Sequence, residues 1–90
     1  ITGAAFDHVL AKFVAAVLKR YPKVLIQWED FGNTNAFRLL ETYRHSVCSF
    51  NDDIQGTACV ALSGLITAAK LAKTPFVEHR FLFLGAGEAG

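Results

Sequence analysis

The sequence predicts an α/β fold in which helices flank a parallel sheet. Apolar side chains between residues 6 and 18 recur with the spacing of an amphipathic helix. Two short apolar runs, at residues 24–28 and 46–50, have the composition of buried strands, and a helical stretch separates them. Because strands that alternate with helices usually form parallel sheets with both faces covered, we expect that architecture here.

The first two helices have identifiable ends and faces. The first ends near Lys19 and Arg20, whose charges suit the C-terminal end of a helix dipole, and Pro22 stops it. The second is expected at residues 35–43, with an apolar face that carries Phe37, Leu40 and Tyr43.

A third helix and a third strand complete the predicted order of elements. The helix is expected to take Asp53 or a neighbouring residue as its N-cap and to continue to about Ala72. Its many small residues predict close packing against a sheet or another helix. Residues 80–84 read as a strand that leads into a glycine-rich loop at residues 85–90.

Composition restricts the class of protein. With 52% hydrophobic and 19% charged residues among 90, the chain can fill a core, and a net charge of +1 without a basic stripe argues against nucleic-acid binding. No apolar run approaches 18 residues, so we expect no membrane partner. Cys48 and Cys59 lie in apolar surroundings, and we expect free, buried thiols of an intracellular protein. The chain begins at Ile1 and stops inside a glycine motif, so we expect a piece of a longer protein.

Acidic pairs follow both predicted strands. Glu29 and Asp30 come after the first strand, and Asp52 and Asp53 come after the second. The C-terminal ends of parallel strands meet at one edge of a sheet, where a cation would offset the repulsion between the carboxylates. Oxygen ligands favour Mg²⁺ or Mn²⁺. The alternative is that these residues are helix N-caps or solvated loop charges, and Asp53 can serve as a cap while its neighbour binds metal.

The glycine loop has the spacing Gly-x-Gly-x-x-Gly and directly follows the third predicted strand. In that context the glycines permit a tight turn and a close approach of backbone N–H groups to a pyrophosphate. The sheet would thus lead into the start of a Rossmann-type dinucleotide-binding domain. An ordinary glycine turn is the alternative.

Three sequence blocks together resemble malic enzymes: LIQWEDFGN at residues 25–33, FNDDIQGTA at residues 50–58 and FLGAGEAG at residues 83–90. The resemblance covers essentially the whole chain. It implies oxidative decarboxylation of L-malate to pyruvate and CO₂, with NAD⁺ or NADP⁺ and with Mn²⁺ or Mg²⁺. It also implies that residues 1–75 belong to the N-terminal, metal-binding catalytic domain and residues 76–90 begin the NAD(P)-binding domain. We expect the complete protein to be a homo-oligomer.

Carried over to this sequence, the resemblance implies a role for each motif residue. The implied metal ligands are Glu29, Asp30 and Asp53, and Asp52 would support a catalytic lysine. Asn33 and Thr57 are implied to lie near the cofactor; a turn asparagine and a helix-start hydroxyl are the alternatives. The implied phosphate-binding loop consists of Gly85, Ala86, Gly87, Glu88, Ala89 and Gly90.

The family's general base, a lysine, and its general acid, a tyrosine, are expected N-terminal to this segment. We therefore assign neither role to Lys19, Lys23, Tyr21 or Tyr43, and we expect the isolated chain to be inactive. One alternative is a Mg²⁺-binding module of the phosphoryl-transfer receiver type, although a glycine loop after the last strand favours a dinucleotide enzyme. Another is a different NAD(P)-dependent dehydrogenase.

Overall fold

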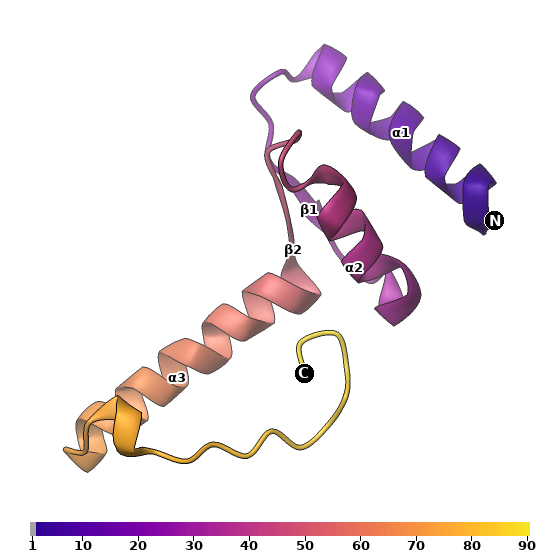
Figure 1. Ribbon diagram of the computed structural model, residues 1–90. Helices are drawn as coiled ribbons and strands as arrows, with labels where there is room; N and C mark the ends of the chain where they lie inside the picture. The colour runs from indigo at the N-terminus through magenta and orange to yellow at the C-terminus, as the bar shows by residue number, and fades with distance from the viewer. Residues whose placement is uncertain (1) are drawn as a thin grey trace.

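The structure is a computed structural model that describes residues 2–90 (Figure 1). Helices and short strands alternate along the chain, as the sequence predicts. The elements in order are α1 (Gly3–Arg20), β1 (Ile26–Trp28), α2 (Gly32–Tyr43), β2 (Ser49–Asn51), a π-helical turn η1 (Asp52–Gly56), α3 (Thr57–Ala72) and a 3₁₀ turn η2 (Phe76–Glu78).

The two strands form a parallel pair, which confirms the α/β arrangement predicted for them. Ile26 lies opposite Ser49, and Trp28 lies opposite Asn51. Helix α2 makes the crossover between the strands and packs against both of them. The observed strands are shorter than the apolar runs that predict them, because only residues 26–28 and 49–51 have a ladder partner.

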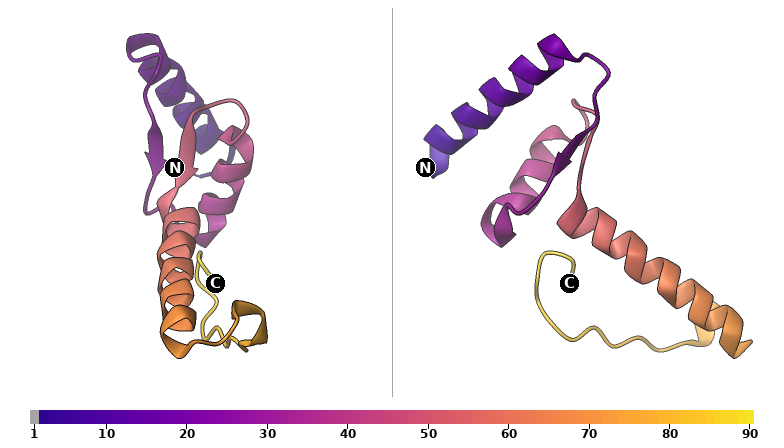
Figure 2. Two further views of the ribbon diagram at one scale, coloured as in Figure 1. Left: turned by 90° about the vertical axis from the view of Figure 1, so that its left-hand side faces the viewer. Right: turned by 180° about the vertical axis from the view of Figure 1, so that it is seen from behind.

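The core lies on one face of this sheet. Val14 of α1 packs with Ile26 and Trp28, and all three are buried. The Trp28 ring lies 5.8 Å from the Phe31 ring and 5.4 Å from the Tyr43 ring, measured between centroids. The opposite face exposes Gln27. Within the described chain, helices therefore cover one face of the sheet, and the expectation of two covered faces is wrong for residues 2–90 (Figure 2).

Helix α2 buries the expected face at Leu40 and Tyr43 but not at Phe37. Ala36, Leu39 and Leu40 are buried, whereas Phe37 is 50% exposed. Ala36 and Leu40 are four residues apart and share a face, whereas Phe37 is rotated about 100° from Ala36 around the helix axis. Phe37 was therefore a wrong core assignment, and the helix begins three residues earlier than expected, at Gly32.

The predicted third strand is absent from the described residues. Residues 80–84 have no ladder partner; they run beneath α3 and back toward the sheet (Figure 1). Leu82 is 91% exposed and Leu84 is 98% exposed. Strand formation needs a neighbour for the backbone N–H and C=O groups, and the sheet contains β1 and β2 alone in this part of the molecule.

Helix α3 extends away from the sheet and leaves the molecule elongated. The radius of gyration is 17.1 Å, whereas a compact domain of this length would have about 12 Å. Only Ala69 of α3 is buried, so the close packing predicted for its small residues does not occur within residues 2–90. Both cysteines are free, as expected, but Cys48 and Cys59 are exposed rather than buried.

One helical stretch meets the length and composition of a membrane span. Among residues 2–90 this is Asp52–Ala72, which is 21 residues long and contains an 18-residue window with a mean hydropathy of 1.3, contrary to the expectation that no apolar run approaches 18 residues. The core helix of a soluble protein passes the same test, so this feature alone does not identify a membrane protein.

Replacement of Leu39 by alanine tests the core on the sheet. Leu39 is 3% exposed, so we expect Leu39→Ala to lower the free energy of unfolding of this chain by about 2–5 kcal/mol, because the change leaves a cavity. Urea titration followed by the fluorescence of Trp28, the one tryptophan, measures it. Leu71→Ala is the matched control, since Leu71 is 80% exposed on α3. Equal effects of the two substitutions would contradict the assigned core.

Candidate metal site

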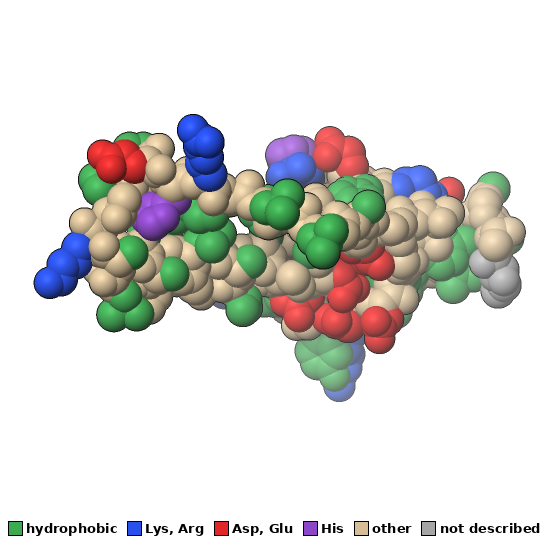
Figure 3. Space-filling model, turned by 90° about the horizontal axis from the view of Figure 1, so that it is seen from below, with side chains coloured by type: hydrophobic (Ala, Val, Ile, Leu, Met, Phe, Trp, Pro, Cys, Tyr) green, Lys and Arg blue, Asp and Glu red, His purple; other side chains and the backbone are tan. Residues whose placement is uncertain are grey.

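Three carboxylates meet where the two strands end. Glu29 and Asp30 follow β1, and Asp53 lies in η1, directly after β2. One oxygen from each lies within 4.8 Å of the others. Parallel pairing brings these residues together, since it places both C-terminal strand ends at the same edge. A patch of acidic side chains is visible on this side of the molecule (Figure 3).

Hydrogen bonds orient two of the three carboxylates. Gln27 Nε2 donates to Glu29 Oε2 over 2.8 Å. The backbone N–H of Asp30 donates to Asp53 Oδ2 over 2.9 Å and so joins the ends of the two strands. Asp30 has a φ of 58° and Gly32 a φ of 68°, so the chain turns sharply between β1 and α2. Aspartate tolerates this left-handed conformation better than most residues because its short side chain bonds locally.

Asn51 shapes the turn that carries Asp53. Its side-chain oxygen accepts from the N–H of Ile54 over 2.9 Å, and its own N–H donates to Gln55 Oε1 over 3.0 Å. Asn51 therefore caps η1 and is completely buried. The cap was expected at Asp53 or a neighbouring residue; Asp53 is not the cap, because its carboxylate accepts from the Asp30 N–H, and the side chain that caps the turn belongs to Asn51, two positions earlier. The preference of asparagine for N-caps is the signal that could have identified Asn51 from the sequence.

Asp52 is not part of the cluster although it precedes Asp53. A Cβ placed on Gly56 would lie 2.8 Å from Asp52 Cγ, so the Asp52 side chain occupies the space above that glycine. The adjacent aspartates thus have different surroundings, and Gly56 leaves room for the first of them. Thr57 Oγ1 donates to the carbonyl of Asp52 over 3.4 Å, which matches the alternative reading of Thr57 as a helix-start hydroxyl.

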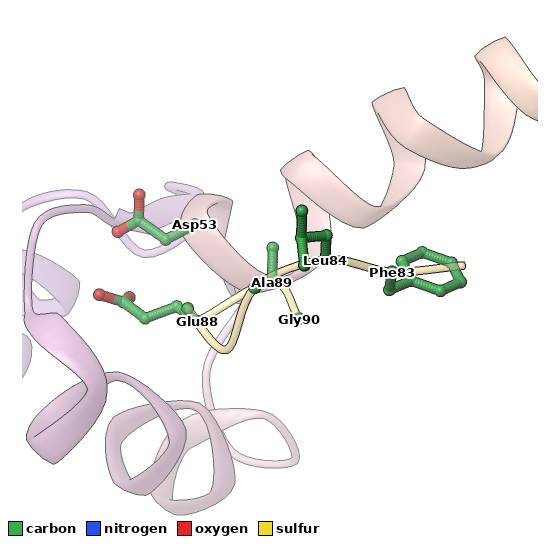
Figure 4. A pocket seen from close by; sticks show the side chains of 8 residues that line it. Asp53, Phe83, Leu84, Glu88, Ala89 and Gly90 are labelled. Atoms are coloured by element: carbon green, nitrogen blue, oxygen red, sulfur yellow. The ribbon is translucent and has the colours of Figure 1, made fainter. Parts of the chain in front are cut away.

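The glycine loop folds back against the acidic cluster. An open hollow of about 430 Å³ lies between them, lined by Asp53, Phe83, Leu84, Gly85, Gly87, Glu88, Ala89 and Gly90 (Figure 4). The loop closes in a turn in which the N–H of Gly90 donates to the carbonyl of Gly87 over 3.2 Å. Gly85 has a φ of 131°, a conformation that favours glycine. Asn33, which was expected near the cofactor, lies exposed in the first turn of α2 and does not line this hollow.

Glu88 brings a fourth carboxylate to this region. Figure 4 shows its side chain and that of Asp53 extending to the same side of the loop. Burial, followed by the negative charges of Asp53, Asp30 and Glu29, raises the pKa of Glu88. Glu88 Oε2 is buried and has no hydrogen-bond partner within the described chain. The sequence motif placed Glu88 in the phosphate loop but gave no sign that its side chain faces the acidic cluster.

Comparison with known proteins identifies the family. Residues 1–44 match the family model of the malic enzyme N-terminal domain, and residues 54–90 match that of the malic enzyme NAD-binding domain. The chain belongs to the malic enzyme family. This confirms the resemblance and places the chain in an enzyme family rather than with phosphoryl-transfer receivers. The match to the N-terminal domain ends at residue 44, and the match to the NAD-binding domain begins at residue 54. The domain boundary expected between residues 75 and 76 stays a prediction.

Malic enzymes from plants, birds and bacteria match along the whole chain. NADP-dependent malic enzyme 1 of Arabidopsis thaliana is 57% identical over 90 residues, which are 99% of this chain and 16% of that protein. The NADP-dependent malic enzyme of Columba livia is 54% identical, with the same coverage. The NAD-dependent malic enzyme of Erwinia tasmaniensis is 52% identical over 100% of the chain and 16% of its own length. The chain thus spans about one sixth of these curated relatives.

Replacement of the cap residue tests the construction of the site. We expect Asn51→Ala to lower the free energy of unfolding by about 0.5–2 kcal/mol, because the N–H of Ile54 loses its acceptor. Asn33→Ala is a matched control, since Asn33 is exposed and surface substitutions usually change stability by less than about 0.5 kcal/mol. Urea unfolding of the three chains measures the difference. A loss no larger for Asn51→Ala than for Asn33→Ala would rule out the cap.

Proposed function

We propose that a protein containing this chain catalyses the oxidative decarboxylation of L-malate to pyruvate and CO₂ with reduction of NAD(P)⁺. The observation that carries the proposal is the meeting of Glu29, Asp30 and Asp53 at the strand ends of a malic enzyme family chain. NAD-dependent and NADP-dependent malic enzymes match this chain at similar identity, so we propose NAD(P)⁺ as the cofactor without choosing between the two forms.

The three carboxylates fit a divalent cation. They are all oxygen donors, which suit Mg²⁺ or Mn²⁺, and they come from two chain segments fixed by strand pairing and by the Asp30–Asp53 hydrogen bond. Three negative charges this close repel one another unless a cation offsets them. When bound, such a cation supplies Lewis-acid polarisation of a substrate oxygen and stabilises developing negative charge.

The chain's other residues supply positioning. Asp52 is partly buried and lies outside the cluster of the three proposed ligands, so it is free to support a lysine from elsewhere in the protein. Gly85 and residues 87–90 line the hollow beside Asp53; we propose that backbone N–H groups of the glycine loop hold the cofactor phosphates as the start of a Rossmann-type domain. The hollow between loop and cluster would then place cofactor and substrate next to each other.

Asp53→Asn tests the proposed metal ligand in the full-length protein. The substitution keeps the shape of the side chain but removes its charge, so we expect Mn²⁺ affinity to fall by at least about 10-fold, by analogy with losses of 10–100-fold for residues that only support ligands. Malate-dependent formation of NAD(P)H should fall below detection. Mn²⁺ binding is measured by electron paramagnetic resonance, and turnover by absorbance of the reduced nicotinamide.

Two further aspartates provide matched controls. Asp52→Asn should leave Mn²⁺ affinity within about threefold of wild type, because Asp52 does not join the cluster. It should still lower turnover, because Asp52 is proposed to support the catalytic lysine. Asp7→Asn, on α1, breaks an exposed ion pair with Arg38, and such pairs contribute only about 0–1 kcal/mol, so both readouts should stay near wild type. Wild-type Mn²⁺ binding by Asp53→Asn would remove the metal assignment and the proposed function with it.

The isolated 90-residue chain should show no turnover. The acid and base that family resemblance implies lie outside it, so absorbance of reduced nicotinamide should not rise when malate, Mn²⁺ and NAD(P)⁺ are added. Sustained formation of pyruvate by the purified chain would show that the chemistry needs nothing beyond these residues.

A further inference from the structure

The glycine loop carries one charged side chain, and it is acidic. Residues 85–90 read Gly-Ala-Gly-Glu-Ala-Gly, so Glu88 is the only residue of the loop with a side chain longer than a methyl group. A carboxylate that faced a bound pyrophosphate would repel it. In the structure the Glu88 side chain instead extends to the side on which Asp53 lies (Figure 4).

The Glu88 carboxylate lies among negative charges and lacks a hydrogen-bond partner at one oxygen. Oε2 of Glu88 is buried without a hydrogen-bond partner among residues 2–90, and the charged groups that act on it, Asp53, Asp30 and Glu29, are all negative. A buried oxygen without a partner is costly, and such atoms in native proteins usually meet a proton donor or a cation. The cation proposed for the other three carboxylates would satisfy this fourth one as well.

We propose that Glu88 is a fourth carboxylate of the cation site and that cation binding thereby fixes the glycine loop beside the strand-end cluster. This inference rests on the proposed function, because it concerns the same cation. Glu88 is not among the three residues whose oxygens lie within 4.8 Å of one another. Its contribution therefore comes from the edge of the site, where a cation-bound water serves as a bridge, since Mg²⁺ usually keeps several of its waters.

The consequence is a link between two sites that come from different parts of the chain. Glu29 and Asp30 lie about 60 positions before Glu88 in the sequence, yet one cation would hold both segments. A loop ordered in this way has its backbone N–H groups arranged before the dinucleotide arrives, which lowers the entropy lost on cofactor binding. The cation would then strengthen cofactor binding without touching the cofactor.

The test measures Mn²⁺ binding to the full-length protein without malate or cofactor. Outer residues that support metal ligands typically cost 10–100-fold in affinity when they are changed, so we expect Glu88→Gln to weaken Mn²⁺ binding by about 10-fold. Glu78→Gln is the matched control, because Glu78 is exposed on η2 and lies outside the cluster. Its affinity should stay within about twofold of wild type. Wild-type affinity in Glu88→Gln would overturn the proposal.

A second readout tests the coupling to the loop. Amide hydrogen exchange of residues 85–90 should slow when Mn²⁺ is added to the wild-type protein and should change little in Glu88→Gln. Equal slowing in both proteins would overturn the coupling. Asp53→Asn in the same Mn²⁺ titration distinguishes failure of the Glu88 proposal from failure of the metal site. Weak Mn²⁺ binding by Asp53→Asn with normal binding by Glu88→Gln refutes only the role of Glu88. Normal binding by both variants refutes the metal site itself.

Discussion

The parallel pairing of β1 with β2 is the constraint on which the site depends. The register that sets Trp28 opposite Asn51 also sets the residues after each strand side by side, and the hydrogen bond from Asp30 to Asp53 continues this alignment beyond the last ladder pair. A shift of the strand-pairing register by one residue would turn the Trp28 side chain from the core to the exposed face of the sheet. Burial of Trp28 against Phe31 and Tyr43 therefore stabilises the register that assembles the carboxylates.

The same strand ends carry an energetic cost. Trp28 Nε1 and Asn51 Nδ2 are both buried without a hydrogen-bond partner in residues 2–90, and each such group costs about 1–3 kcal/mol. A smaller apolar residue at position 51 would avoid one of these costs but would lose the cap on η1. Asn51 thus holds Asp53 in place at some expense in stability, which is common where a site must be built at the edge of a core.

Local patterns in the sequence predicted the elements, and non-local contacts decided where prediction failed. The spacing of apolar residues located α1, and the acidic residues after each run pointed to the edge where three of them meet. The strand at residues 80–84 failed because a strand exists only with a neighbour, and composition does not show whether one is within reach. The orientation of Glu88 was hidden for the same reason, since it depends on how a loop folds back over a cluster that begins 59 positions earlier, at Glu29.

The two neighbouring aspartates show how one turn separates two roles. In a strand, successive side chains point to opposite faces, and on an α-helix they lie about 100° apart. Asp52 and Asp53 begin a π-helical turn, a rare element that often occurs at functional sites. There Asp53 reaches the Asp30 N–H while Asp52 folds over Gly56. The capped turn keeps the charges apart, so one can join the cation cluster while the other remains available to a different part of the protein.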